Sequence, residues 1–123
     1  MPVTGPDFIA LQVRDLERAA EFYETHLGLV RGAAGPPGAV VFTTTPIAFA
    51  VREPMPGVDL DAAVPRPGLG VALWLHTDNA QQLHDELAAA DVAIAVAPFD
   101  GPFGRTFTFI DPDGYAVTMH DQA

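Results

Sequence analysis

The sequence contains no cysteine, which excludes disulfide bonds, thiolate catalysis and cysteine-ligated zinc. It contains no lysine either: six arginines stand against 16 acidic residues, and the formal net charge is −10. Because phosphate binding needs clustered positive charge, this composition argues against a nucleic-acid partner. No apolar run approaches the ~20 residues of a membrane span, and no basic-then-apolar leader opens the chain. We therefore expect no membrane association and a cytoplasmic protein.

What is present suits a folded domain. Of the 123 residues, 49% are hydrophobic and 9% are aromatic, a balance typical of globular proteins rather than disordered ones. A chain of this length buries roughly two-thirds of its unfolded surface when it folds as one unit. We therefore expect a single domain over residues 1–123.

Helix-boundary signals mark the N-terminal region. The β-prone run Phe8–Val13 is followed by Asp15, a residue type that caps helix N-termini, and by an apolar stripe over Leu16–Leu27. Gly28 then stands where a helix C-terminus favours a left-handed residue. The sequence thus predicts a strand, a capped helix and a sharp exit from it.

A turn signal lies between two β-prone runs near the C-terminus. Asp111-Pro-Asp-Gly114 combines a proline that fixes φ, carboxylates that can bond nearby backbone N–H groups, and a glycine that supplies positive φ. Thr106–Ile110 precedes the turn and Tyr115–His120 follows it, which predicts a hairpin. We expect Arg105 to anchor this hairpin to a carboxylate such as one of the two turn aspartates, with contact to a ligand as the alternative.

The two halves of the chain share one order of elements. Superposing Asp15 on Asn79 aligns the apolar stripes of two helices, which indicates an internal repeat. We assign module one to residues 7–52, a proline-rich linker or surface loop to residues 53–70, and module two to residues 71–121. The further strands are expected at Arg31–Ala33, Ala39–Thr44, Ile47–Arg52 and Val71–Thr77, and the second helix is expected to be capped by Asp78 or Asn79.

Together the two ends of the chain resemble the vicinal-oxygen-chelate superfamily, which contains glyoxalase I, extradiol dioxygenases, fosfomycin resistance enzymes and bleomycin-resistance proteins. The resemblance covers nearly the whole chain. It implies an α+β fold in which two βαβββ modules form curled, mostly antiparallel sheets around a cavity, with the helices outside. The stretches that carry it are Asp15-Leu-x-x-Ala19, Phe22-Tyr23, Leu27-Gly-Leu29, Gly104-Arg-x-Phe107 and Asp111-Pro-Asp-Gly114.

In metal-using members of this superfamily, four side chains converge on the cavity and bind a divalent ion that polarises vicinal oxygens or activates dioxygen. Carried over onto this sequence, those positions fall on Phe8, on the alanines of the run Ile47–Val51, on Ala72 and on Thr118. The first three offer no carboxylate or imidazole, and a threonine hydroxyl is a weak donor for such ions. We therefore expect no metal and no cofactor.

Strand alternation selects the side chains that face the cavity. The sets expected to pack on the helices are Ile9, Leu11 and Val13; Val71, Leu73 and Leu75; and Tyr115, Val117 and Met119. Phe103 is added because Pro102-Phe-Gly-Arg105 resembles the Pro-Trp-Gly-Arg stretch of bleomycin-resistance proteins, which places an aromatic side chain at the mouth of the pocket. The candidate ligand-binding residues are Phe8, Gln12, Trp74, His76, Phe103, Thr118 and His120.

These residues leave alternatives open. Trp74, the only tryptophan, either packs in the core or forms a stacking wall for a planar ligand. His76 and His120 are either structural residues or contacts to the ligand, and in an atypical site they would coordinate an ion with Gln12.

Two functional hypotheses follow. In the first, the protein is a metal-free homodimer that sequesters a hydrophobic or aromatic small molecule such as an antibiotic, without catalytic residues. In the alternative, it is an isomerase, lyase or dioxygenase of the superfamily that uses His76 or His120 as a base or in an atypical metal site. The missing metal ligands favour binding over catalysis.

Overall fold

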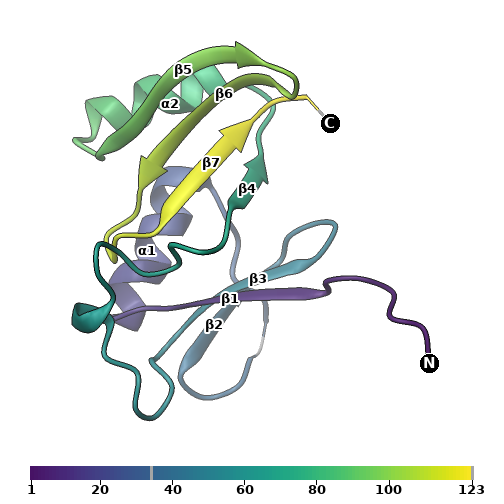
Figure 1. Cartoon of the computed structure of the whole chain (residues 1–123), viewed down its shortest axis with the longest axis vertical. Helices are drawn as coiled ribbons and strands as arrows, with labels where there is room; N and C mark the ends of the chain where they lie inside the picture. The colour runs from purple at the N-terminus through teal and green to yellow at the C-terminus, as the bar shows by residue number, and fades with distance from the viewer. Residues whose placement is uncertain (34, 123) are drawn as a thin grey trace. The chain divides into compact units, whose positions relative to one another are not determined.

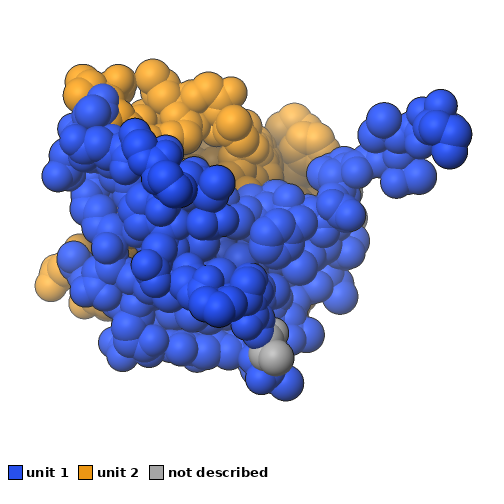
Figure 2. All heavy atoms as spheres, turned by 90° about the horizontal axis from the view of Figure 1, so that it is seen from below, with its two compact units in different colours: residues 1–62 blue, residues 63–123 orange. Residues whose placement is uncertain are grey.

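Two units make up the chain, residues 1–62 and residues 63–123, which Figure 2 shows in different colours. The structure, a computed structural model, describes residues 1–33 and 35–122 (Figure 1). Over this part of the chain each unit contains one α-helix and one mixed sheet, so the expected α+β class is confirmed. Neither sheet closes into a barrel, and the boundary between the units falls inside the proline-rich segment 53–70.

The first unit has a three-stranded sheet with the order β1-β3-β2. Strand β1 pairs with β3 in parallel, and β2 pairs with β3 antiparallel. The helix between β1 and β2 carries the chain away from the sheet, which lets the last strand return beside the first in the parallel sense. The elements of this unit are β1 (Phe8–Gln12), α1 (Leu16–Leu27), β2 (Ala39–Phe42), β3 (Ala48–Arg52) and a short 3₁₀ helix, η1 (Leu60–Ala62).

Helix α1 begins and ends where the sequence signals predict. The carboxylate of Asp15 accepts a hydrogen bond from the N–H of Arg18 at 3.1 Å, which satisfies a backbone donor at the helix start. Gly28 ends the helix in the left-handed conformation, with φ of 69°. The buried ring of Tyr23 lies edge-on to Phe49 of β3, with 5.2 Å between ring centroids. This contact holds α1 against the sheet of its own unit.

The prediction of a strand at Arg31–Ala33 is wrong. Among the described residues, this segment contributes a single antiparallel bridge, between Arg31 and Phe42. The guanidinium of Arg31 instead binds the carboxylates of Glu17 and Glu24 on α1, and its hydrogen bond to Glu17 lowers the pKa of that carboxyl below the usual value. The run that follows contains Pro36 and Pro37, which have no N–H to donate to a ladder. The described part of the first module is therefore βαββ rather than βαβββ.

The second unit has a four-stranded sheet with the order β4-β7-β6-β5. Figure 1 shows α2 lying against β5 and β6, and the core between them contains the buried side chains of Leu87, Phe107 and Phe109. The elements are β4 (Leu73–His76), α2 (Ala80–Ala89), β5 (Ile94–Gly101), β6 (Gly104–Ile110) and β7 (Ala116–His120).

Within the described residues, neither α-helix has the length and apolar character that crossing a membrane requires.

The two units repeat one topology. Of the two candidate caps for α2, Asn79 is the one used: its side-chain oxygen accepts a hydrogen bond from the N–H of Gln82 at 3.0 Å. Asn79 thus occupies the place that Asp15 holds in the first unit. Strand β4 pairs in parallel with β7, the last strand of its module, as β1 pairs with β3. This agreement supports the internal repeat inferred from the sequence.

Strand β4 is shorter than expected, because the first two predicted residues and the last, Thr77, lie outside it. Val71 is 74% exposed, and its N–H donates to the carbonyl of Gly68 at 3.0 Å in a turn. Gly68 has a positive φ of 73°, a conformation that glycine adopts easily and that bends the chain before the strand. The prediction that Val71 packs on the helix is therefore wrong, and the buried face of β4 begins at Leu73.

The Asp111–Gly114 turn joins β6 to β7 as predicted. The carboxylate of Asp111 accepts hydrogen bonds from the N–H groups of Asp113 and Tyr115 at 2.9 and 3.0 Å, and Gly114 has φ of 100°. Because Asp111 is buried, its carboxylate takes the place of the water that these donors would otherwise need. The turn sets a register in which Thr106 lies opposite His120 and Ile110 lies opposite Ala116.

Candidate functional site

Strands β4 and β7 place four of the predicted site residues next to one another. In their parallel register, Trp74 lies beside Thr118 and His76 lies beside His120. The alternate residues of these strands, such as Leu73 and Val117, are buried. Because neighbouring residues of a strand point to opposite faces, the predicted site residues share the face of the sheet that α2 does not cover. The alternation argument thus separated the buried face from the open face correctly along β4 and β7.

Four rings gather on this face, and we call Trp74, His76, Phe103 and His120 the aromatic cluster. The ring of Trp74 lies 5.8 Å from that of Phe103 in an edge-to-face contact and 5.6 Å from the imidazole of His120. His120 also lies 5.7 Å from His76 and 6.1 Å from Phe103, measured between ring centroids. The side chain of His120 is therefore the centre of the cluster.

The cluster is open rather than part of the core. Trp74 is 45% exposed and Phe103 is 49% exposed, whereas fully buried aromatic side chains of this unit, such as Phe107, lie on the opposite face. Of the two interpretations of Trp74, core packing is therefore wrong for this unit. Large aromatic side chains that remain half exposed leave apolar area that a ligand can bury.

The backbone of Gln122 holds two members of the cluster in place. Its carbonyl lies 2.8 Å from Nδ1 of His120, and its N–H donates to the carbonyl of Phe103 at 3.0 Å. Because a carbonyl oxygen only accepts hydrogen bonds, the proton of this first contact belongs to Nδ1. In the neutral imidazole, Nε2 then carries the lone pair and serves as an acceptor.

The loop that carries Phe103 is tied to the N-terminus of α2. The carboxylate of Asp121 accepts hydrogen bonds from the N–H of Arg105 at 2.9 Å and from the N–H of Ala80 at 3.2 Å. The guanidinium of Arg105 donates to the side chains of Asp100 at 3.1 Å and Gln81 at 2.9 Å. These contacts position the cluster through the ends of β6 and β7.

The expected partner of Arg105 is therefore wrong. The carboxylate that Arg105 binds belongs to Asp100, which lies directly opposite Arg105 in the β5–β6 ladder. The Asp111 carboxylate accepts from turn N–H groups at the other end of the hairpin, and sequence spacing alone did not distinguish these acidic residues.

Thr118 contributes a hydroxyl that already has a partner. Its Oγ1 lies 2.8 Å from Oγ1 of Thr108 on β6, and either atom can be the donor. This pair lies between the aromatic residues of β4 and the exposed Val96 of β5, because Val96 lies opposite Thr108. The open face therefore has a polar middle flanked by apolar side chains.

Sequence reasoning missed two residues on this face, Val96 and Phe99, which are 44% and 46% exposed. Phe99 lies opposite Thr106, and Thr106 lies opposite His120, so the three share one face. The signal that marks such residues is alternation along the strand. Two register shifts in β5 break that alternation, which is why it did not identify them.

Phe8 and Gln12, the remaining candidates, belong to β1 of the first unit, so the aromatic cluster forms without them. Phe8 is 51% exposed. The side-chain carbonyl of Gln12 accepts a hydrogen bond from the N–H of Met55 at 2.8 Å, which fastens the start of segment 53–70 to the strand. Gln12 thus has a structural role that the sequence did not indicate.

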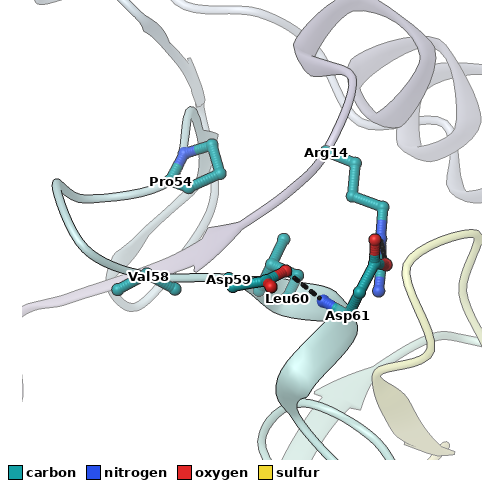
Figure 3. A pocket seen from close by; sticks show the side chains of 6 residues that line it. All are labelled: Arg14, Pro54, Val58, Asp59, Leu60 and Asp61. Carbon is teal, nitrogen blue, oxygen red and sulfur yellow. Dashed lines mark hydrogen bonds and ion pairs between the residues drawn. The ribbon is translucent and has the colours of Figure 1, made fainter.

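The first unit has a shallow pocket of its own, with a volume of ≈ 240 Å³ (Figure 3). Arg14 forms an ion pair with Asp61 there at 2.8 Å, and the N–H of Asp61 donates to the Asp59 carboxylate at 2.9 Å. The side chains of both members of the ion pair are largely exposed. Such contacts order a loop but select no ligand. The lining residues are Arg14, Pro54, Val58, Asp59, Leu60 and Asp61.

The residues present do not fit the divalent ion of the metal-using relatives. Within residues 1–33 and 35–122, no three histidine, aspartate or glutamate side chains gather in a way that could hold a metal ion. Of the positions carried over from the resemblance, Phe8 and Ala72 have no donor atom, and the Thr118 hydroxyl is paired with Thr108. No chemical step through such an ion is derived for this site.

Comparison with known proteins identifies the family. The model of the Glyoxalase/Bleomycin resistance protein/Dioxygenase superfamily matches residues 5–119. The chain belongs to this superfamily. The resemblance drawn from the two ends of the sequence is therefore confirmed. No curated protein matches the chain in sequence.

Solved structures of this superfamily fold resemble the chain over nearly its full length. TnmS3, an antibiotic binding protein from Streptomyces sp. CB03234, has a TM-score of 0.76 and 23% identity, covering 100% of this chain and 99% of that one. Lactoylglutathione lyase from Agrobacterium tumefaciens has a TM-score of 0.68 and 20% identity, with 98% and 95% covered. The fosfomycin resistance protein FosX from Mesorhizobium loti has a TM-score of 0.68 and 17% identity, with 99% and 95% covered. At such low identity these neighbours establish the superfamily fold.

Proposed function

We propose that this superfamily member binds an aromatic or hydrophobic small molecule, in particular an antibiotic, and sequesters it without a metal ion and without altering it. The observation that carries the proposal is the half-exposed ring of Trp74, with Phe103 and His120 packed beside it. Each well-placed aromatic pair adds ~0.5–1.5 kcal/mol to binding beyond the burial of apolar area. Several rings on one face therefore favour a planar ligand.

The donor set favours binding over the enzymatic alternative. A histidine base alone accelerates a reaction by about 10²–10⁴-fold, and the positions that hold the ion in metal-using relatives are apolar or hydroxylic here. Among the similar structures, TnmS3 is described as an antibiotic binding protein, while the lyase and FosX carry enzyme or resistance names. The absence of carboxylate and imidazole side chains from those positions of this chain supports binding without a metal ion.

Fluorescence of the lone tryptophan tests the proposal, because the whole emission at tryptophan wavelengths comes from the cluster. We expect bleomycin-like, quinone or enediyne compounds to quench Trp74 saturably at a one-to-one ratio, since a ligand stacked on the indole contacts its excited state directly. The control is N-acetyltryptophanamide, which reports collisional quenching and light absorption by the compound. Quenching that stays linear with every compound, as in this control, contradicts binding.

The fate of the ligand separates the two hypotheses. Chromatography of the compound recovered after hours with the protein is expected to return it unchanged. A product formed at a rate proportional to protein concentration would instead establish an enzyme, and its loss in His120→Asn would assign the base.

We further propose a cytoplasmic homodimer. Strands β4 and β5 pair on one side only within the described sheet, and such edges are commonly covered by a second copy. Sedimentation at micromolar concentration is expected to give twice the 13.0 kDa mass of the chain, and a stable monomer would contradict the dimer.

A further inference from the structure

We propose that the ligand is a phenol, and that its hydroxyl donates a hydrogen bond to Nε2 of His120 while its ring contacts Trp74 and Phe103. This inference rests on the proposed function and adds to it a class of ligand and a residue that selects it. The proton on Nδ1 of His120 is held there by the backbone carbonyl of Gln122.

The imidazole of His120 is held in one orientation and one tautomer. A ring flip about the Cβ–Cγ bond would replace Nδ1 by a carbon atom and break the 2.8 Å hydrogen bond to the Gln122 carbonyl. The rings of His76, Trp74 and Phe103, all within 6.1 Å of its centroid, surround the imidazole further. The neutral side chain therefore has a fixed acceptor, Nε2, on the ring at the centre of the aromatic cluster.

The charges around the cluster favour a neutral donor over an anion. The guanidinium of Arg105 already donates to Asp100 and Gln81, so it is engaged by the protein itself. The Asp121 carboxylate lies at the same end of the sheet, and the chain as a whole carries a formal charge of −10. A carboxylate or sulfonate on the ligand would be repelled by these groups and would bring no proton for Nε2.

A phenol meets both requirements at once. Its ring supplies the flat apolar area that the half-exposed Trp74 and Phe103 leave open. Its O–H is a strong, compact donor that lies in the plane of the ring, so one rigid group satisfies the acceptor and the aromatic wall together. A methyl ether of the same ring keeps the apolar area and loses the donor, which makes it the matched comparison.

The test compares 2-naphthol with 2-methoxynaphthalene by isothermal titration calorimetry of the full chain at about pH 8. We expect the wild-type protein to bind the naphthol about 3- to 10-fold more tightly, the range that one net hydrogen bond supplies. His120→Asn keeps an amide N–H at the position of Nδ1 for the Gln122 carbonyl and removes the acceptor. In this variant the preference should fall below about twofold.

His120→Gln is the second variant, because its side-chain carbonyl reaches the position of Nε2 and restores an acceptor. We expect it to recover part of the preference for the naphthol, and a variant that lost preference through misfolding would not do so. Circular dichroism and thermal unfolding of both variants confirm that they are folded.

The outcomes separate this inference from the proposed function. If the wild-type protein binds both compounds equally, or if His120→Asn keeps the full preference, the assignment to His120 is wrong while aromatic binding stands. If neither compound binds at millimolar concentration, the phenol inference is wrong, because 2-naphthol presents both the ring and the donor. The quenching of Trp74 by antibiotics then decides the proposed function independently.

Discussion

Replacing Gly104 by alanine is expected to lower the free energy of unfolding by about 2–5 kcal/mol. Gly104 has φ of 88°, a conformation that costs a residue with a side chain ~1–2 kcal/mol. An added Cβ would also overlap the Asp121 carboxylate and lie 2.8 Å from Cγ and 3.0 Å from N of Gln122. Overpacking of this kind adds ~1–3 kcal/mol. Urea denaturation of the variant and the wild type measures the difference.

Gly57→Ala is the matched control for this prediction. Gly57 has nearly the same φ, 85°, but its added Cβ would meet no heavy atom within 4 Å. This variant therefore carries the conformational cost alone, about 1–2 kcal/mol. Equal losses in the two variants would mean that the contact with Asp121 and Gln122 relaxes without cost, contrary to our expectation.

The same contact links stability to the site. The backbone of Gln122 bonds both His120 and Phe103, and the Asp121 carboxylate bonds both Arg105 and Ala80. A Cβ at Gly104 would press on this two-residue segment from one side. The glycine is thus required by the close approach of β7's C-terminal extension to the loop before β6.

Local signals explain how much of the fold was predictable from the sequence. The cap at Asp15, the left-handed exit at Gly28 and the turn at Asp111–Gly114 depend on contacts between residues at most five positions apart, and each is present in the structure. Such contacts depend on short stretches of sequence, so they can be predicted without knowledge of the rest of the fold.

The errors arise where distant residues decide the outcome. The segment at Arg31 forms only one bridge to Phe42, while its guanidinium binds two carboxylates on α1. Arg105 binds Asp100 because the β5–β6 register places them opposite each other. Neither partner follows from spacing along the chain. Register shifts in β5 likewise moved Phe99 onto the open face without an alternating pattern to show it.

The residues of the open face were predicted best where strands are regular. Alternation in β4 and β7 identified Trp74, His76, Thr118 and His120, and the structure brings them onto one face. Alternation does not predict that Nδ1 of His120 carries the proton, because the tautomer depends on the carbonyl of Gln122, beyond the end of β7. The residues were therefore accessible from sequence, while the chemistry of the central imidazole was not.

Trp74→Ala is expected to weaken binding of an aromatic antibiotic by about 30-fold or more. A truncated tryptophan at the centre of a binding surface commonly costs at least ~2 kcal/mol, which corresponds to about 30-fold in the dissociation constant. The loss combines stacking with the burial of an indole that is 45% exposed in the free protein. Because the variant has no tryptophan, calorimetry rather than fluorescence must measure the affinity.

Two further variants make this result specific to the aromatic cluster. Phe103→Ala removes the ring that meets Trp74 edge-on at 5.8 Å, and we expect a loss of about 5- to 10-fold, the value of one aromatic pair with its buried area. Val64→Ala removes a side chain that is 81% exposed in the same unit and is not a member of the aromatic cluster, and it should leave affinity within about twofold. If all three variants bind alike, the ligand lies elsewhere. A graded loss in which Trp74 exceeds Phe103 and Phe103 exceeds Val64 would place the ligand on the open face of the second sheet, because Trp74 and Phe103 belong to the aromatic cluster there and Val64 does not.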